Sequence, residues 1–183
     1  METEERARLA KLDTIVRSDE LRAKINPIVD RVCAALSQKP EALMTWEPIA
    51  VEIFGQTLPP EIRSGWIFVL RAGADTGPER HPNSHQRMMT LHGSGDMRVL
   101  AGVRAGLAST WQSNALVSEP SAALERRWIS IPPNVWHRPV VGPDVDWVVL
   151  SFHTVPADEL IEEKMDESGA GTKRKKYVEG IKK

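Results

Sequence analysis

The sequence of 183 residues predicts a β-sandwich or β-barrel that follows a helical N-terminal segment. Between residues 46 and 155, short runs rich in β-branched and aromatic residues alternate with Gly and Pro, and no helical pattern of useful length separates them. Many short strands with regular turns are typical of an antiparallel sandwich or barrel. The expected strands are 49–54, 66–71, 86–92, 97–103, 128–131 and 147–154.

The N-terminal part predicts helices. Its first 38 residues contain no Gly and one Pro, Pro27. Apolar residues recur there at spacings of three and four, beginning with Leu9 and Leu12, as an amphipathic helix requires. Ser18 precedes two acidic residues and is typical of a helix N-cap. We therefore expect an N-terminal helical extension over 1–45, split or kinked at Pro27.

The barrel is expected over 46–156, followed by a different C-terminal part over 157–183. Residues 158–163 predict a short helix. The small residues 168–171 predict a flexible break. The basic run 173–176 then predicts a solvated tail, because no aromatic-rich basic surface accompanies it.

Composition excludes several classes of protein. The net charge is −1 and the pI about 6.5, whereas nucleic-acid and membrane-surface proteins usually carry a strong basic excess. The longest apolar run, 145–152, is far shorter than the roughly 20 residues that cross a bilayer. The N-terminus has no apolar signal region, and the lone Cys33 forms no intrachain disulfide. We expect a reduced, cytoplasmic protein with no nucleic-acid or membrane partner.

All five histidines fall in the β-rich zone. Imidazole is the commonest metal ligand in proteins, so a group of histidines near strand ends is a candidate metal site. They are His81, His85, His92, His137 and His153.

The segment 73–93 resembles the first motif of the cupin family, which is a Gly, five residues, His-x-His, three or four residues, Glu, six residues and a Gly. Gly73 and Gly93 stand at the two glycine positions. His81 stands at the second His, Gln86 replaces the Glu, and Glu79 stands where the first His is expected.

The segment 129–139 resembles the second cupin motif, whose core is Pro-x-Gly-x-x-His. Pro132 and His137 match, and Asn134 replaces the Gly. Asn is the non-glycine residue that best tolerates a positive φ, so the turn can survive this change. The resemblance covers about 46–155 and implies an all-β cupin fold, a double-stranded β-helix or jelly-roll barrel.

The resemblance also implies a divalent metal ion, with Fe(II), Mn, Ni and Zn as candidates. His81 and His137 would hold it, with Glu79 or Gln86 completing the site. An alternative ligand set uses His85 with the two motif histidines. Two His and one carboxylate match the donors of non-haem Fe(II) sites with open positions.

Strand periodicity extends the expected pocket. Glu79 and His81 are two residues apart, so their side chains project to one face of a strand. Every second residue after Gln86, namely Met88, Thr90 and His92, shares the face of Gln86, and His85 points to the opposite face. We also expect Trp136 at the pocket mouth and Arg71 as a candidate partner for a substrate carboxylate. With His85 kept from the alternative ligand set, the possible additional pocket residues are His85, His92, Met88, Thr90, Trp136 and Arg71.

The first hypothesis for function is a metal-dependent enzyme of dioxygenase type acting on a small molecule. The alternatives are a non-catalytic small-molecule-binding or sensor barrel, and a metal-independent isomerase or epimerase with His81 or His137 as base. Edge strands of such barrels are suited to dimerisation, so a homodimer is a further hypothesis.

Overall fold

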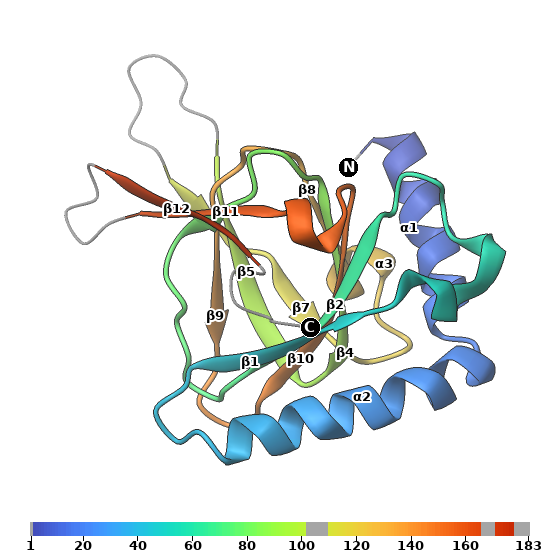
Figure 1. Ribbon diagram of the computed structural model, residues 1–183, viewed down its shortest axis with the longest axis horizontal. Coiled ribbons are helices and arrows are strands. Elements are labelled where there is room, and N and C mark those ends of the chain that lie inside the picture. Colours follow the sequence, from blue (N-terminus) through green and yellow to red (C-terminus); the bar gives the residue numbers. More distant parts are fainter. Residues whose placement is uncertain (1, 102–109, 166–170, 178–183) are drawn as a thin grey trace.

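Two antiparallel sheets form a barrel, and two N-terminal helices lie against its outside (Figure 1). The computed structural model describes residues 2–101, 110–165 and 171–177. Its helical elements are α1 (Thr3–Val16), α2 (Asp19–Ser37), α3 (Leu124–Arg127) and two 3₁₀ segments, η1 (Val51–Thr57) and η2 (Ala157–Glu159).

The first sheet has the strand order β1-β2-β10-β4-β8. The second has the order β12-β11-β3-β9-β5-β6, with β7 paired to β5. The strand pairs that carry the two sheets are antiparallel, which confirms the jelly-roll expectation. The bounds are β1 (Met44–Ile49), β2 (Ser64–Leu70), β3 (Glu79–Arg80), β4 (Gln86–His92), β5 (Ser94–Leu100), β6 (Trp111–Gln112), β7 (Ala115–Val117), β8 (Trp128–Ile131), β9 (His137–Val141), β10 (Trp147–His153), β11 (Ile161–Met165) and β12 (Thr172–Lys176).

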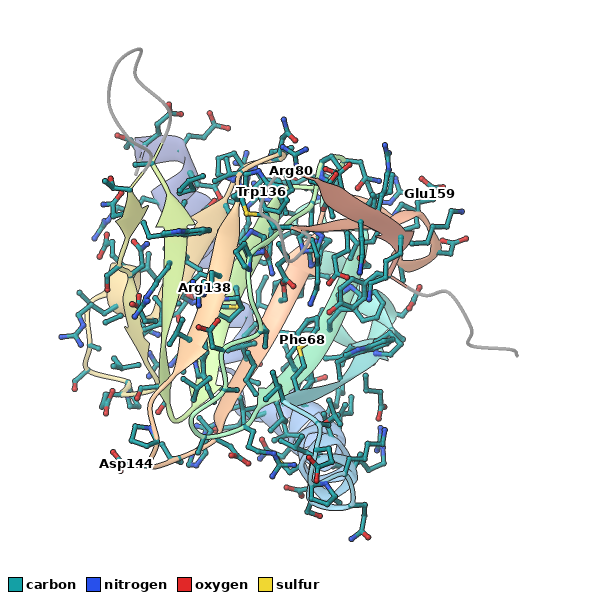
Figure 2. The ribbon with its side chains drawn as sticks, turned by 90° about the vertical axis from the view of Figure 1, so that its left-hand side faces the viewer. Phe68, Arg80, Trp136, Arg138, Asp144 and Glu159 are labelled. Carbon is teal, nitrogen blue, oxygen red and sulfur yellow. The ribbon has the colours of Figure 1, made fainter. Side chains whose placement is uncertain are left out.

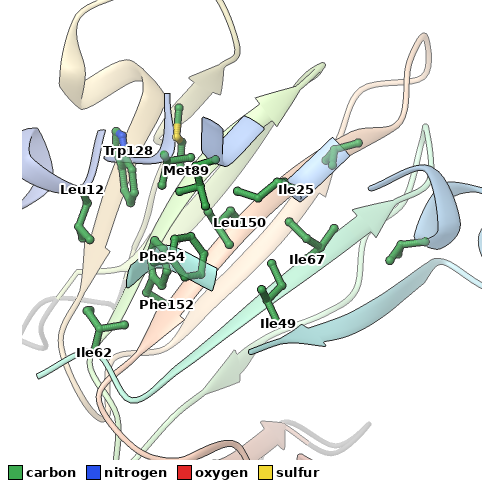
Figure 3. Close-up of a cluster of buried hydrophobic side chains, with 14 of the residues drawn as sticks. Leu12, Ile25, Ile49, Phe54, Ile62, Ile67, Met89, Trp128, Leu150 and Phe152 are labelled. Carbon is green, nitrogen blue, oxygen red and sulfur yellow. The ribbon is translucent and has the colours of Figure 1, made fainter. Parts of the chain in front are cut away.

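Side chains of the first sheet alternate between two hydrophobic clusters. On β2, Trp66 and Phe68 point into the barrel, whereas Ile67 and Val69 point to the outer face. This period of two is what an extended strand imposes when both faces are buried. The outer cluster, which joins the sheet to α1 and α2, is shown in Figure 3.

The helical extension is an integral cover of the outer sheet face. Leu9 and Leu12 are fully buried in the outer cluster, as their spacing predicted. Asp13 pairs with Arg127 and also accepts a hydrogen bond of 2.9 Å from Trp128 Nε1. Ser18 caps α2, because its Oγ accepts from the backbone N–H of Leu21 at 3.4 Å.

Two expectations about local structure are corrected. Pro27 does not split the helix, since α2 runs through it and the break between helices falls before Asp19. Of the expected strand 49–54, only Ile49 lies in a strand, at the end of β1, whereas 51–54 begin the 3₁₀ segment η1, in which the ring of Phe54 lies 5.1 Å from that of Phe152. The strand of this region, β1, lies earlier in the chain.

The C-terminal part also differs from expectation. Residues 158–163 form the end of η2 and the start of β11 rather than a helix, and the basic run 173–176 lies in β12. Cross-strand charge pairs favour this hairpin, because Glu162 is opposite Lys175 and Glu163 is opposite Arg174. The expected break 168–171 lies mostly outside the described residues. Among those that are described, no helix has the length and apolar character to span a membrane.

Candidate metal site

Three buried side chains from the two motifs meet inside the barrel. Glu79 begins β3, His81 follows that strand, and His137 begins β9. Glu79 and His137 are direct cross-strand partners, which places their side chains on one face. One ligand atom from each of the three residues lies within 4.8 Å of the others. Their exposures are 8%, 4% and 0%, so water has little access to them.

The turn of the second motif ties the two motifs together. Asn134 has φ of +67°, the left-handed conformation that the motif requires, and this confirms the expectation drawn from its replacing Gly. Its backbone N–H donates to the carbonyl of His81 at 3.0 Å. The turn therefore fixes the backbone beside both histidines.

Backbone carbonyls set the tautomers of both histidines. His81 Nδ1 lies 3.0 Å from the carbonyl of Ile161, and His137 Nδ1 lies 3.1 Å from that of Val135. A carbonyl only accepts, so each Nδ1 carries the hydrogen and a neutral ring presents the lone pair of Nε2. Hydrogen bonds of this kind orient metal-binding histidines.

The local electrostatics favour the ligand forms of these groups. Burial raises the pKa of Glu79, but its neighbours His137, Lys164 and His81 outweigh burial and hold that pKa well below its ordinary value. Burial and the charge of His137 lower the pKa of His81 to about 4. At neutral pH the site therefore contains a carboxylate and a neutral imidazole, the forms that bind metals.

Unsatisfied atoms show that the residues fit a cation. His137 Nε2 and Glu79 Oε2 are buried without a hydrogen-bond partner, and His137 Nε2 lies 3.6 Å from Glu79 Oε1. In a neutral ring this Nε2 turns a lone pair toward the carboxylate, which is unfavourable in a buried site unless a positive charge, either a proton or a metal ion, lies between them. Ligand atoms that are each about 2.1 Å from one ion lie at most about 4.2 Å apart, so only a small contraction of the group is needed.

Gln86 adds a further oxygen to the same interior. Its Nε2 donates to Ser151 Oγ at 3.0 Å, while its Oε1 is buried and unpartnered. Ser151 Oγ also lies 3.2 Å from His153 Nε2, and Ser84 Oγ lies 3.2 Å from His153 Nδ1. Both nitrogens of His153 are therefore occupied, and its ring packs edge-on at 4.9 Å from His81.

Sequence reasoning missed the charged residues that β11 brings to the site. Lys164 Nζ lies 3.4 Å from Glu79 Oε2 and 3.9 Å from Glu162 Oε1. Glu162 is 1% exposed and pairs with Lys175 at 2.9 Å. Burial, and then the charge of Glu79, raise the pKa of Glu162. No motif identified these residues, because this region was expected to be helical.

The free space inside the barrel is small. The interior cavity has a volume of about 20 Å³, which is room for one water molecule and not for an organic substrate. Tyr177, which directly follows β12, helps to fill the barrel. The cavity is lined by Met44, Phe68, Leu70, Glu79, Gln86, Met88, Met97, Pro139, Trp147, Val149 and Tyr177.

Two of the additional pocket residues lie inside the barrel. Met88 lines the cavity, as the count from Gln86 predicted. Thr90 is buried and accepts a hydrogen bond of 3.0 Å from Trp147 Nε1. His92 is exposed on the outside, which corrects the expectation. The register shift between β4 and β10 leaves Leu91 as an extra residue and ends the alternation before His92.

The other additional residues do not reach the cavity. His85 points outward, as its register predicted, and its Nε2 lies 2.7 Å from Ser130 Oγ, so the alternative ligand set is not brought together. Arg71 donates to the carbonyls of Ala42, Leu36 and Lys39 and so holds the C-terminal end of α2. Trp136 packs under the guanidinium of Arg80 at 4.6 Å, at one end of the barrel (Figure 2).

A larger hollow lies outside the barrel. It has a volume of about 640 Å³ and is bordered by α1 and by outward-facing residues of β4 and β8. Glu5 lies there, paired with Arg87 at 2.6 Å and Arg8 at 2.7 Å, and accepts from Ser130 Oγ at 2.6 Å. These partners satisfy the carboxylate of Glu5. The buried ligand atoms inside the barrel, which have no hydrogen-bond partner, are therefore the better candidate for a metal site.

The described strands form a single jelly-roll barrel, and the segments that resemble the two cupin motifs meet inside it. No family model and no curated protein matches the sequence. Solved structures with a similar fold include an oxalate oxidase, 13% identical with a TM-score of 0.47, where the match covers 62% of this chain and 52% of that one.

Two further structures show the same likeness. An oxalate decarboxylase from Lactobacillus farciminis, solved as a formate complex, is 16% identical with a TM-score of 0.46, and the match covers 62% of this chain and 29% of that chain. An 11S globulin from Wrightia tinctoria is 15% identical with a TM-score of 0.49, covering 67% and 27%. The chain thus matches about half of the oxalate oxidase and less than a third of the other two. The likeness concerns the fold alone.

Proposed function

We propose that this protein binds one divalent metal ion through Glu79, His81 and His137 and is a metal-dependent oxidoreductase of dioxygenase type acting on a small organic molecule. Gln86 Oε1 is the proposed fourth donor. The supporting observation is the unsatisfied pair of Glu79 and His137 Nε2 in a dry interior. Fe(II) is the preferred ion, because two His and one carboxylate are the donors of non-haem Fe(II) oxygenases.

The chain's own residues have defined roles in this proposal. The carbonyls of Ile161 and Val135 hold Nδ1 of the two imidazoles and leave Nε2 of each ring to bind the ion, with that of His137 facing Glu79. The barrel excludes bulk water, which strengthens charge interactions within the site. A bound ion supplies Lewis acidity and, for iron, a redox centre.

Metal content tests the first half of the proposal. Protein purified without chelator and reconstituted with Fe(II) under argon is expected to carry one ion per chain by elemental analysis. His137→Ala should abolish stoichiometric binding, whereas His92→Ala, which changes an exposed histidine outside the barrel, should retain it. A content far below one ion per wild-type chain after reconstitution would refute the metal site.

Oxygen consumption tests the second half. Reconstituted protein is expected to consume O₂ in proportion to the loss of one substrate from a panel of small acids, thiols and phenols. If metal is bound at one ion per chain and no substrate supports uptake, the oxidoreductase proposal fails while the metal site stands.

A non-catalytic binding barrel is the second candidate, because Glu79 and Gln86 stand where the first motif has His and Glu, and a neutral Gln is a weaker metal ligand than a carboxylate. It predicts a bound small molecule whose affinity does not change in His81→Ala.

The homodimer also stays a proposal. β1 is an outer edge of its sheet and can offer backbone groups to a second copy. Light scattering at working concentration would show twice the chain mass if it does.

A further inference from the structure

A tyrosine from the C-terminal strand occupies the interior of the barrel beside the candidate metal site. The ring of Tyr177 lies 5.4 Å from Trp46, 5.3 Å from Trp66 and 5.9 Å from Phe68, and 6.1 Å from His81. Its contacts with Trp66, Phe68 and His81 are edge-to-face, the arrangement that aromatic rings prefer. Tyr177 is 8% exposed.

The strand β12, which directly precedes Tyr177, has few buried contacts. All five residues of β12 are exposed, and within the described part of the chain the strand pairs with β11 alone, at the edge of the sheet. Beyond that pairing, the backbone N–H of Tyr177 donates to Leu160 at 2.9 Å, and ion pairs join Lys175 and Arg174 to β11. In Figure 1 the β11–β12 hairpin projects from the barrel. Segments with few buried contacts open at low free-energy cost.

Detaching β12 leaves the other strand pairs of the barrel in place. β11 remains paired with β3 through Glu163–Arg80 and Lys164–Glu79. The candidate metal site lies on β3 and β9 and does not include β12. Withdrawal of Tyr177 would therefore enlarge the cavity from one water molecule to at least the size of a phenol ring, with the aromatic walls unchanged.

The walls of that space indicate what it can hold. Trp46, Trp66 and Phe68 present aromatic surfaces to a flat ring. Glu79 lines the cavity together with Tyr177, and its carboxylate opposes an anionic substituent on a ligand ring.

We propose that Tyr177 is a retractable plug in a binding site for a small, neutral, phenol-like ring, and that such a ligand binds when β12 detaches from β11. A phenol-like ring is also the substrate class that this site would give to the proposed oxidoreductase, and that assignment rests on the proposed function. Because the aromatic site does not involve the metal, it can be tested in chelator. Because Tyr177 occupies the site, the apparent affinity for the ligand equals the intrinsic affinity multiplied by the fraction of molecules in which β12 is detached.

Hydrogen exchange on the wild-type protein in chelator is the decisive measurement. Amides of β12 are expected to exchange at least about 100-fold faster than those of β9, and saturating phenol should accelerate β12 exchange further while leaving β9 unchanged. A tyrosine that is simply part of the core predicts no acceleration by phenol. Either that result or β12 protection equal to that of β9 overturns the plug.

Calorimetric titration with phenol gives the second measurement. Tyr177→Ala is expected to bind phenol at least about tenfold more tightly than wild type, and Lys176→Ala, a change in the adjacent exposed residue, should bind as wild type does. Benzoate should bind Tyr177→Ala at least tenfold more weakly than phenol. Folded Tyr177→Ala with no phenol binding, or with equal affinity for benzoate, overturns the ligand class. If Tyr177→Ala does not fold, the exchange experiment decides. The metal content of the same samples is measured separately, so the phenol affinities can be interpreted even if the protein binds no metal.

Discussion

Glu79 and His137 face each other across the β3–β9 pair, with Glu79 Oε1 3.6 Å from His137 Nε2. The carbonyl of Val135 accepts a hydrogen bond from His137 Nδ1, so in the neutral ring Nε2 turns a lone pair toward the carboxylate. This arrangement is unfavourable by itself and becomes favourable when a proton or a metal ion lies between the two groups.

Gln86→Glu should lower the stability of the metal-free protein and raise its affinity for metal. A second buried carboxylate near Glu79 is expected to lower the melting temperature of the metal-free protein, because like charges in a dry interior repel. The same charge should tighten Fe(II) or Mn(II) binding about tenfold or more. Thermal melts in chelator and in excess metal measure both effects. A variant that is equally stable without metal and binds metal no better would show that Gln86 is remote from the ion.

Lys164→Gln should also tighten metal binding, by about three- to tenfold, because Lys164 Nζ is a positive charge 3.4 Å from Glu79 Oε2. Calorimetric titration with Mn(II) at low salt measures the change. Lys173→Gln is the matched control, since Lys173 is the cross-strand partner of Lys164 but its side chain is exposed. Equal effects from the two substitutions would assign the change to overall charge instead of to contact with Glu79.

The motifs predicted the location of the site but not all of its neighbours. His81, His137 and Glu79 come together as the cupin resemblance and the period of two implied. His92 could not be placed from its spacing, because the bulge at Leu91 depends on pairing with β10, which is distant in sequence.

The residues that the β11–β12 hairpin contributes to the interior could not be predicted from the sequence, for a different reason. Glu162 and Lys164 lie in a run of charged residues with high helix propensity, and only cross-strand ion pairs with β12 make that run a strand. Tyr177 follows four basic residues, which is typical of a solvated tail, yet the ring is buried. Long-range pairing, which no local pattern encodes, thus supplies the lysine and the tyrosine of the interior.

Gly95→Ala should destabilise the barrel. A Cβ at this position on β5 would lie 2.2 Å from the Trp147 ring, and that ring is fully buried and cannot move freely. Overpacking of this kind costs about 1–3 kcal/mol of unfolding free energy. Gly142→Ala provides the control, because nothing lies within 4 Å of a Cβ there. Urea denaturation should separate the two variants, and equal midpoints would contradict the close packing of β5 on Trp147.

Glu5 should contribute a pH-dependent part of the stability. Burial raises the pKa of Glu5, but hydrogen bonds from Arg87, Ser130 and Arg8 outweigh it and lower the pKa to about 2. The ordinary value is 4.5, so the unfolded chain binds a proton more readily than the folded one at acidic pH. The contribution is therefore complete above about pH 4.5 and is lost as the pH falls toward 2.

Glu5→Gln tests that contribution at the junction of α1 and the sheet. At pH 7 the variant is expected to lose about 1–2 kcal/mol of unfolding free energy, a value reduced from the full shift because the group is partly solvated. Between pH 5 and 2 its stability should fall less steeply than that of wild type. Glu4→Gln is the matched control, because its side chain is 84% exposed and its pair with Arg8 lies at the surface. Parallel stability curves for wild type and Glu5→Gln over this range would show that the carboxylate is not held by Arg87 and Ser130 in solution.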